Sequence, residues 1–523
     1  MTRARASTAA RTHDLRRSGW LIGGILALYV TVIVYASLHH EAWRDEVVAL
    51  SIAWQSSSWA ALWRFMRHEG HPILWYVCLR VAHSVVPSTA VLPVLSLLIS
   101  AAAAFVLLRW APFPLWLRCL FLFGYVPLYE YTVVWRGYGL SMLLVFSYCA
   151  LYPARRRHPI VLGVTLALLA NSTVFGLVMA VAAGAMLVVD RLMDDEPMAK
   201  PGPFYCGMAI WAAGIVHTLV NIAPGPAMPQ FELNHHDAAT IVQGILSSVL
   251  FPAGHARGFF WIPWPSLWLW LSFLLLLLLR RLPLLAFFAL SLIGFEVVFT
   301  LAYAPTARHL SSMMVMVMAA VWLGHPWELE NGRASGVASQ PVLRWGRYAL
   351  MVPLLAALCF HVWLGGAAIV DEIRLDYSSS KRLAAIIAAD PRLDRAIVIG
   401  EPETLTQSLP YYRENPIFLP QEGTFRNWLV IQVPGGRPHD CDLRALLATA
   451  KDLRARHQVP VILVLGWWLD GAERQSTYVG TFFEQTFAMT ATAREDFLRQ
   501  TELLGRLRAA TLTDENYDVF VLR

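Results

Sequence analysis

Long apolar runs recur along the first two thirds of the chain, with polar residues gathered in the intervals between them. Each run comes close to the length of about 20 residues that an α-helix needs to cross a bilayer. So many runs exclude a single anchor or a cleaved signal peptide as the explanation. Several runs are short, so we expect some spans to be tilted, broken or re-entrant. The predicted spans are residues 19–38, 89–108, 118–133, 137–152, 159–170, 173–190, 203–222, 261–280, 283–302, 309–324 and 347–366.

The pattern changes after the last of these runs, where strand-like stretches alternate with amphipathic helical ones. This order predicts a small α/β domain, and a stretch of about 155 residues is long enough to bury its own core. The chain therefore divides into a basic tail at 1–18, a polytopic core at 19–366 with a first outer loop at 39–70, and a soluble α/β domain at 367–523. The predicted strands are 396–401, 428–433, 460–466 and 517–522, and the predicted helices are 442–457 and 494–510.

Composition places the chain in the membrane class. Of its 523 residues, 57% are hydrophobic and 15% are charged, whereas an average soluble protein has about 25% charged residues. We therefore expect a mainly α-helical polytopic membrane protein. The net charge of +6 is spread over loops, so nucleic acid is not expected as a partner. The six cysteines are scattered and form no CxxC pair, which predicts neither a disulfide framework nor a zinc site.

Basic residues indicate which loops face the cytoplasm. Five arginines precede the first span, and the positive-inside rule therefore puts the N-terminus inside. By the same rule the inner loops are those with Arg109 and Arg118, Arg155 to Arg157, Arg191 and Lys200, Arg280 and Arg281, and Arg333 to Arg347. Alternation then leaves 39–88, 130–136, 171–172, 223–260, 303–308 and everything after 366 outside.

One apolar segment does not fit this count. The stretch "HPILWYVCLRVAHSVVP" at 71–87 is apolar enough to span but carries Arg80 and His83. If it crosses the membrane, the segment at 116–130 does not. Both solutions leave Glu130 and Arg136 on the outer side.

The first outer loop contains a helical pattern. The stretch "SSSWAALWRFMRHEGHP" at 56–72 begins with serines suited to an N-cap and places Trp59, Leu62, Trp63 and Met66 on one face. This predicts an amphipathic helix lying on the membrane surface. Pro72 ends this helix and can open the next.

The stretch "EAWRDEVVAL" at 41–50 puts an arginine and two carboxylates directly after the first span. Acids of an outer loop are often simply solvated. Asp45 and Glu46, however, are flanked by Trp43 and an apolar run that would hold them near the lipid, where desolvation raises the basicity of a carboxylate. A carboxylate there can take a proton from a hydroxyl as a general base.

Three motifs in this order carry a family resemblance: "WRDE" in the first outer loop, "EGHPILWY" opening the next apolar segment, and "EYTVVWRGYGL" further on. With an N-terminal span before them, they resemble the GT-C superfamily of glycosyltransferases, in the branch of protein O-mannosyltransferases and lipid A aminoarabinose transferases. The resemblance covers roughly residues 15–320. It implies a GT-C fold with about 11 to 13 transmembrane helices and transfer of a sugar from a polyprenyl-phosphate carrier, at the outer face, with inversion at the anomeric carbon.

Roles follow from the resemblance position by position. Asp45 matches the catalytic aspartate of the first loop and is expected to be the general base, and Glu46 is expected to orient the acceptor. Glu130 stands where relatives have an acidic residue, more often Asp, that helps to bind the acceptor or a divalent cation. The resemblance leaves a divalent cation, Mg or Mn, open as a cofactor. It requires no nucleotide at the site.

The leaving phosphate of a lipid carrier needs cationic or hydrogen-bonding partners. Arg136 with Tyr138 in "WRGYGL", and Arg308 with His309 in "PTARHLS", meet that need at predicted outer ends of spans. The alternative for either arginine is a side chain that snorkels to the interface.

Other polar and aromatic residues allow two interpretations. His68, Glu69 and His71 form "HEGH" with the wrong spacing for the helical zinc motif, so we expect polar contacts to sugar or phosphate, from His71 before His68. For His235, His236 and Asp237 a solvated loop is favoured over a metal site, and 241–251 beside them is expected to wall the acceptor entrance. The tryptophans that could stack on a sugar or serve the interfacial belt or domain contacts are Trp43, Trp75, Trp135, Trp467 and Trp468.

The function expected from these residues is that of a multi-pass glycosyltransferase of the bacterial inner membrane, with its active site on the periplasmic side. Its partners would be a polyprenyl-phosphate-linked sugar donor, membrane lipids, and a glycolipid, polysaccharide or protein acceptor. A transporter of envelope lipids or sugars is the alternative, but transporters usually place ionisable residues in mid-span and repeat their halves. An inactive membrane scaffold is a third interpretation.

Overall fold

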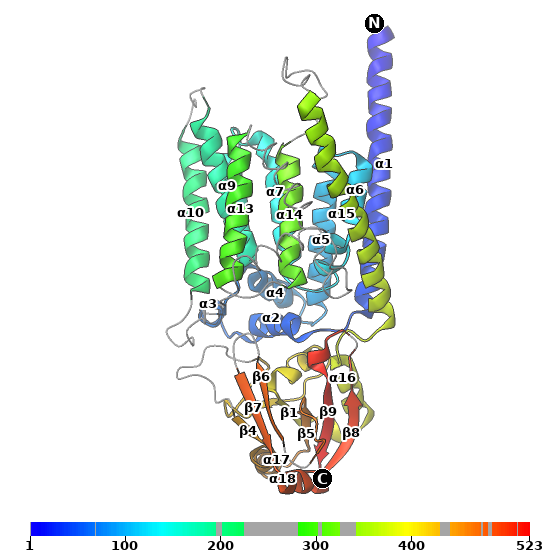
Figure 1. Cartoon of the computed structure of the whole chain (residues 1–523), viewed down its shortest axis with the longest axis vertical. Coiled ribbons are helices and arrows are strands. Elements are labelled where there is room, and N and C mark those ends of the chain that lie inside the picture. The colour runs from blue at the N-terminus through cyan, green and yellow to red at the C-terminus, as the bar shows by residue number, and fades with distance from the viewer. Residues whose placement is uncertain are drawn as a thin grey trace.

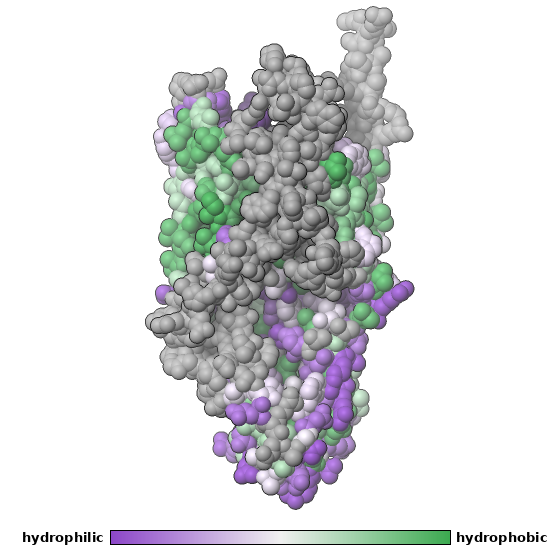
Figure 2. All heavy atoms as spheres, viewed as in Figure 1, coloured by the Kyte–Doolittle hydropathy of each residue, from purple (hydrophilic) through white to green (hydrophobic). Residues whose placement is uncertain are grey.

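The chain folds into a bundle of long helices with a smaller α/β domain at one end (Figure 1). A computed structural model describes residues 2–67, 69–194, 201–223, 281–301, 306–324, 341–428, 440–471, 474–479, 484–509 and 511–523. The N-terminus and the α/β domain lie at opposite ends of the bundle. Figure 2 shows hydrophobic side chains over the bundle and mostly hydrophilic ones over the α/β domain, as expected for a membrane part and a solvated part. The predicted span at 261–280, His68, and the stretches 234–240 and 241–251 lie outside the described residues.

Long apolar helices confirm the membrane class. Within the described ranges, seven helices are long and apolar enough to cross a bilayer, and two shorter apolar helices accompany them. The helix α14 is the most enclosed of the seven, with 78% of its apolar window buried. The seven are α1 (Thr2–His39), α5 (Val91–Trp110), α9 (Val174–Leu192), α10 (Gly202–Ile222), α13 (Leu282–Leu301), α14 (Ala307–Gly324) and α15 (Pro341–Arg374), and the shorter ones are α7 (Tyr138–Leu151), extended by η2 (Tyr152–Ala154), and α8 (Pro159–Ala170).

The span predicted at 118–133 is not one helix. It consists of α6 (Leu115–Leu122), a π-helical turn η1 (Val126–Glu130) and irregular chain to residue 137. Pro127 interrupts the helical hydrogen bonds because it has no N–H to donate. In the irregular chain after η1, the carbonyls of Tyr131 and Thr132 accept bonds from serines of α5, at 3.1 and 2.9 Å. Irregular backbone is tolerated inside a bundle when neighbouring side chains satisfy it in this way.

Three short helices lie together between the bundle and the α/β domain (Figure 1): α2 (Arg44–Gln55), α3 (Trp59–Met66) and α4 (Leu74–Val85). The predicted helix of the first outer loop is confirmed as α3, and Ser58 caps it by accepting a bond from the backbone N–H of Ala61 at 3.0 Å. The 12 residues of α4 extend only about 18 Å, too short for a bilayer of about 30 Å. The segment at 71–87 therefore does not cross, and 116–130 passes through the bundle in broken form.

The α/β domain is built around a six-stranded sheet in the order β3-β2-β1-β5-β9-β8, beside a three-stranded sheet in the order β4-β7-β6. Strands β2, β1 and β5 are parallel, and β9 and β8 continue the sheet antiparallel. The strands are β1 (Ile397–Glu401), β2 (Ile417–Leu419), β3 (Thr424–Phe425), β4 (Asp440–Asp442), β5 (Val461–Leu465), β6 (Arg474–Val479), β7 (Glu484–Met489), β8 (Thr501–Leu507) and β9 (Tyr517–Leu522). The helices are α16 (Ser380–Ala389), α17 (Leu443–His457) and α18 (Ala491–Gln500), with short turns η5 (Pro391–Leu393), η6 (Glu403–Thr406), η7 (Leu409–Tyr411) and η8 (Thr513–Glu515).

Most of the predicted elements of this domain are confirmed, and one is wrong. The helix predicted at 494–510 ends at Gln500, and strand β8 follows at once. Residues 501–507 form β8 and pair with β9. The pairing with a distant strand therefore outweighed the helical pattern of these residues. The strand predicted at 428–433 lies almost entirely outside the described residues. At the boundary of the domain, α15 continues to Arg374, beyond the predicted end of its span.

Helices α8 and α10 approach each other through glycines. A Cβ added at Gly163 would lie 2.1 Å from the backbone oxygen of Gly207, and one added at Gly207 would lie 2.4 Å from that of Pro159. Small residues allow such close approach, which is a main source of helix association in membranes. Both helices also pack against α9.

We expect Gly163→Val to lower the stability of the helical bundle, because the new side chain must push the two backbones apart. Overpacking of this kind costs about 1–3 kcal/mol, so the midpoint of thermal unfolding in detergent should fall. Gly23→Val is the control, since a Cβ at Gly23 meets nothing within 4 Å. Equal midpoints for the two variants would show that the glycine contact is not needed.

Candidate functional site

The predicted carboxylates lie in the first turn of α2, which begins directly after the four residues that follow α1. The N-terminus of a helix stabilises acidic side chains through its macrodipole. The Glu46 carboxylate also reaches back to accept the backbone N–H of Trp43 at 2.8 Å, a capping contact that fixes where α2 begins. Asp45 and Glu46 point to different surroundings as a result.

Glu46 is fully buried and belongs to a chain of charges. Its carboxylate accepts the backbone N–H of Trp135 at 2.7 Å and contacts Nε2 of His40 at 3.1 Å. On the other side of the ring, Nδ1 of His40 lies 3.0 Å from Glu372 of α15. Burial lowers the pKa of His40, but the two carboxylates outweigh it and raise the pKa to about 10. The imidazole is therefore a cation at neutral pH.

This burial speaks against the acceptor contact expected for Glu46. No part of its side chain is exposed, and its oxygens are taken by Trp43, Trp135 and His40. Glu46 instead holds the end of α1, the start of α2 and the broken segment together.

The Asp45 carboxylate faces three arginines. Arg136 pairs with it through Nη1, and Arg44 and Arg308 place nitrogens 3.7 and 3.8 Å away. At the same time 38% of the Asp45 side chain is exposed, so a ligand can reach it.

The arginines also set the charge state of Asp45. Burial alone would raise the pKa of this carboxyl, but the charge of Arg136, followed by the charges of the other two arginines, outweighs it and holds the pKa below the ordinary value. The sequence-based expectation of a raised basicity was therefore wrong. Arg136 and Arg308 are far from Asp45 in the sequence, so their position beside it could not be predicted.

Arg136 and Arg308 share an aromatic platform. Their guanidinium carbons lie 5.5 and 4.2 Å from the centroid of the Trp43 ring, within the range of cation–π attraction. His71 lies on the other side of Arg136, with Nε2 3.3 Å from Nη2. Burial, followed by the charge of Arg136, lowers the pKa of His71 to about 4. His71 is therefore neutral and can accept or donate a hydrogen bond beside the arginine.

Glu130 supports Arg308 from the broken segment. Its Oε1 lies 3.9 Å from Nε of Arg308, and its Oε2 accepts a bond from the hydroxyl of Tyr125 at 2.6 Å. The hydroxyl of Tyr131 donates to the carbonyl of Arg308 at 3.0 Å and lies 2.7 Å from the hydroxyl of Ser312. Arg308 is thus fixed at its side chain and at its backbone.

Tyr138 and His309 form a second aromatic layer behind this cluster. Tyr138 stacks on Tyr131 at 5.3 Å between ring centroids, and the His309 ring lies 6.1 Å from that of Tyr138 and 5.4 Å from that of Phe175. The structure thus brings Asp45, Glu130, Arg136 and Arg308 together with the remaining predicted site residues nearby, at the end of the bundle next to the α/β domain.

The two site carboxylates do not fit a divalent cation well. Asp45 faces three arginines, and Glu130 is held by Arg308 and Tyr125, so positive charge already fills their surroundings. Among the described residues, no group of three or more His, Cys, Asp and Glu side chains has the arrangement of a metal site. Another acid, Glu69, lies nearby. Burial, followed by the charge of Asp45, raises the pKa of Glu69 to about 8.

The sequence left two uses open for the tryptophans, and the structure gives the surroundings of four of them. Trp135 is 2% exposed and donates through Nε1 to Ser37 at 2.9 Å, and Trp75 is 5% exposed. Both are core residues and neither is open to a sugar. Trp467 stacks on Phe487, and Trp468 lies under Arg508, so both belong to the α/β domain itself.

Sequence reasoning missed the partners of the motif residues. Glu372 binds His40, and the acids at 514 and 515 bind Arg44. Glu372 gave a weak signal, because an acid at the end of an apolar run is uncommon. The acids near the C-terminus gave none.

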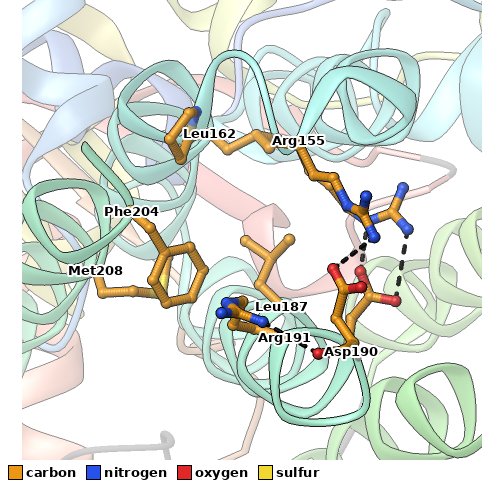
Figure 3. A pocket seen from close by; sticks show the side chains of 10 residues that line it. Arg155, Leu162, Leu187, Asp190, Arg191, Phe204 and Met208 are labelled. Atoms are coloured by element: carbon orange, nitrogen blue, oxygen red, sulfur yellow. Dashed lines mark hydrogen bonds and ion pairs between the residues drawn. The ribbon is translucent and has the colours of Figure 1, made fainter. Parts of the chain in front are cut away.

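A separate pocket lies at the other end of the bundle (Figure 3). Apolar side chains of α8, α9 and α10 line one part of it, and arginines form the other part. Arg155 pairs with Asp190, and Arg156 pairs with Asp194 at 2.5 Å. None of the predicted site residues lies in this pocket. The ion pairs tie the loop after α7 to the end of α9.

Comparison with protein-family models and with curated proteins finds no match. Two solved structures are similar to the chain. The crystal structure of ArnT from Cupriavidus metallidurans in the apo state has 14% identity and a TM-score of 0.48, with 97% of this chain and 98% of that one covered. The crystal structure of the same protein bound to undecaprenyl phosphate has 12% identity and a TM-score of 0.46, with 96% and 98% covered.

We expect His40→Gln to destabilise the protein in a pH-dependent way, because it leaves Glu46 and Glu372 buried without their cation. Breaking a buried pair costs about 3–5 kcal/mol. A histidine whose pKa is raised on folding contributes its full stability below its ordinary pKa of about 6.5, and loses it as the pH rises through about 10. The difference in unfolding temperature between wild type and variant should therefore become smaller as the pH rises from about 6 to about 10.

His39→Gln is the matched control for this measurement. His39 is the neighbouring residue, and its ring contacts the backbone carbonyl of Tyr35 at 2.9 Å. A gap for His40→Gln that stays constant over the whole pH range would contradict a charged His40.

Proposed function

We propose that the chain is an integral-membrane glycosyltransferase that moves a sugar from a polyprenyl-phosphate carrier to an acceptor hydroxyl on the periplasmic face of the bacterial inner membrane. One observation carries the proposal. The carboxylate of the "WRDE" motif, Asp45, meets the two guanidinium groups of Arg136 and Arg308 at one end of an apolar helical bundle. A partly exposed base beside two fixed cations suits the departure of a phosphate from a sugar.

The charge of the site favours an anionic donor. Arg44 is shared between Asp45 and Asp514 of the α/β domain, and the nitrogens of Arg308 lie 3.8 Å from Asp45 and 3.9 Å from Glu130. Neither contact of Arg308 is a short ion pair, so its guanidinium can bind a further anion. A lipid-linked phosphate would suit Arg308 and Arg136, because guanidinium groups bind phosphate with two parallel hydrogen bonds.

The donor also needs an apolar route for its lipid. The site lies at the ends of α1, α14 and the broken segment. Hydrophobic side chains cover most of the described bundle surface that Figure 2 shows. A polyprenyl chain can remain in the bilayer while its phosphate reaches the arginines. This arrangement supports lateral entry of the donor from the membrane.

In the proposed reaction Asp45 takes the proton of the acceptor hydroxyl while that oxygen attacks the anomeric carbon. The bond between the anomeric carbon and the phosphate oxygen breaks on the opposite face, which inverts the configuration. The bonding electrons leave with the phosphate, and Arg136 and Arg308 stabilise its charge. The proton remains on Asp45 until solvent removes it.

The arginines link the two halves of this reaction. Without an anion beside them they hold the Asp45 carboxylate in ion pairs and weaken it as a base. A phosphate that engages Arg136 would draw the guanidinium away and restore the basicity of Asp45. The base would then be active only with the donor bound. His71 would complete the phosphate contacts beside Arg136.

We expect Asp45→Asn to lower turnover by about 100- to 10,000-fold, the usual contribution of a general base, with the fold intact. The measurement is mass spectrometry of envelope glycolipids and glycans from cells that lack the gene and carry either wild type or variant. Loss of one hexose, pentose or uronic acid would identify the sugar and the acceptor together. The control is Asp452→Asn, because Asp452 is an exposed residue of α17.

Unchanged glycans in the deletion strain would contradict the proposed function. Unchanged turnover in Asp45→Asn, with a glycan that does depend on the gene, would contradict only the role of Asp45.

We expect Arg136→Gln to move the acid limb of the pH profile of kcat/KM to higher pH. Arg136 is the largest of the influences that keep the pKa of Asp45 low against burial, so its removal raises that pKa. Residual activity should therefore need a higher pH to deprotonate Asp45. Arg155→Gln, whose ion pair lies at the other end of the bundle, should leave the limb in place.

A further inference from the structure

The loop that carries the proposed base is held from outside the bundle. Residues 40–43 join α1 to α2 and form no helix or strand. The backbone N–H of Ala42 donates to the hydroxyl of Tyr412 at 2.8 Å, and its carbonyl accepts from the hydroxyl of Ser380 at 2.8 Å. Both partners belong to the α/β domain. Ala42 is fully buried between them.

The residues on either side of Ala42 also contact the α/β domain. The side chain of Glu41 accepts the backbone N–H of Ser378 at 3.1 Å. The backbone N–H of Arg44 donates to Glu515 at 3.4 Å, and the guanidinium of Arg44 pairs with Asp514. This stretch therefore contacts the domain through three of its residues, 41, 42 and 44.

The partners in the domain are themselves tied together. Glu515 accepts a hydrogen bond from the hydroxyl of Ser378, which also contacts Ser380. Glu515 is 1% exposed, and the two serines are fully buried. Burial raises the pKa of Glu515 to about 7 against the charge of Arg44. Buried polar groups of this kind are bound to partners because they cannot find water.

Arg44 connects this network to Asp45. Its Nε lies 3.7 Å from the Asp45 carboxylate, while its Nη2 pairs with Asp514. One guanidinium is thus shared between the proposed base and the domain. If Asp514 released it, Arg44 could close on Asp45 and hold it in a tighter ion pair.

The position of the domain fits such a role. The turns η6 and η7, which follow β1, contact α2, and the ring of Tyr411 lies 5.5 Å from that of Trp135. Trp428 contacts Phe65 of α3 at 5.6 Å between ring centroids. Figure 1 shows the short outer helices lying between the sheets and the bundle.

We propose that the C-terminal α/β domain positions the loop 40–43 and the first turn of α2, which carries the base, with Tyr412 and Asp514 as the positioning residues. Tyr412 fixes the backbone of the loop, and Asp514 draws Arg44 away from Asp45. The catalytic meaning of this arrangement rests on the proposed function, but the mechanical part does not. A domain that served only as a tether or acceptor platform would have no need to bind the backbone of this loop.

The test uses the full-length protein in detergent and two double variants. Tyr412→Phe with Asp514→Asn removes one oxygen and one charge that hold the loop. Tyr411→Phe with Asp496→Asn is the matched control, because Tyr411 is the adjacent tyrosine and Asp496 is a partly exposed acid that pairs with Arg499 on α18. Hydrogen–deuterium exchange of peptides covering residues 40–47 is the first measurement.

We expect these amides to exchange at least tenfold faster in the first double variant than in the wild type. In the control variant their exchange should equal that of the wild type. The unfolding temperatures should stay close to each other, which separates local release from global destabilisation. Exchange that is equal in both variants would overturn the proposal. If the first variant fails to fold, Asp514→Asn alone gives the same comparison against Asp496→Asn.

The second measurement is the pH profile of transfer. Asp514→Asn should lower kcat by tenfold or more and move the acid limb to lower pH, because the released Arg44 lowers the pKa of Asp45 further. Asp514→Glu should restore both. Faster exchange with unchanged kcat and pH profile would overturn the catalytic meaning of the contact. A wild-type protein without any transfer activity would refute the proposed function and leave the exchange result to decide the mechanical part.

Discussion

The outer end of the molecule depends on the buried chain of charges formed by Glu46, His40 and Glu372. Each charge is excluded from water, so each is stable only because the next one compensates it. The chain joins α1, α2 and α15, and through the backbone N–H of Trp135 it also joins the broken segment. Elements that are more than 300 residues apart in sequence are thereby fixed against one another.

The neighbouring Asp45 shows the opposite use of a carboxylate. Its partners are arginines, its side chain is partly exposed, and its charge is held by groups that a phosphate can also bind. The two adjacent acids of the "WRDE" motif therefore separate into a buried acid, Glu46, and an accessible one, Asp45. One residue of spacing on a helix, about 100° of rotation, is enough to produce this division.

The broken segment is the other structural condition for the site. A continuous helix over 118–133 would have carried Glu130 on a regular helical face. The π-helical turn and the irregular chain instead bring Glu130 to Arg308 and Arg136 to Asp45. Serines of α5 make this path tolerable by binding two of its carbonyls.

The sequence by itself determined the class of the protein. Spans, the short outer helix and most strands follow from periodicity and composition, because each depends on residues close together in the chain. Asp45, Arg136 and Arg308 could also be named, from motifs and their place at span ends. The helix predicted at 494–510 failed where β8 pairs with β9, since strand pairing depends on a distant partner.

Only the tertiary structure decided the chemistry of these residues. The pKa of Asp45 takes its direction from an arginine 91 positions away, and Arg44 meets Asp514 at a separation of 470. The burial of Glu46 depends on α15 and on the broken segment. Charges act through space at distances of a few ångströms, and a linear sequence does not contain those distances until the chain has packed.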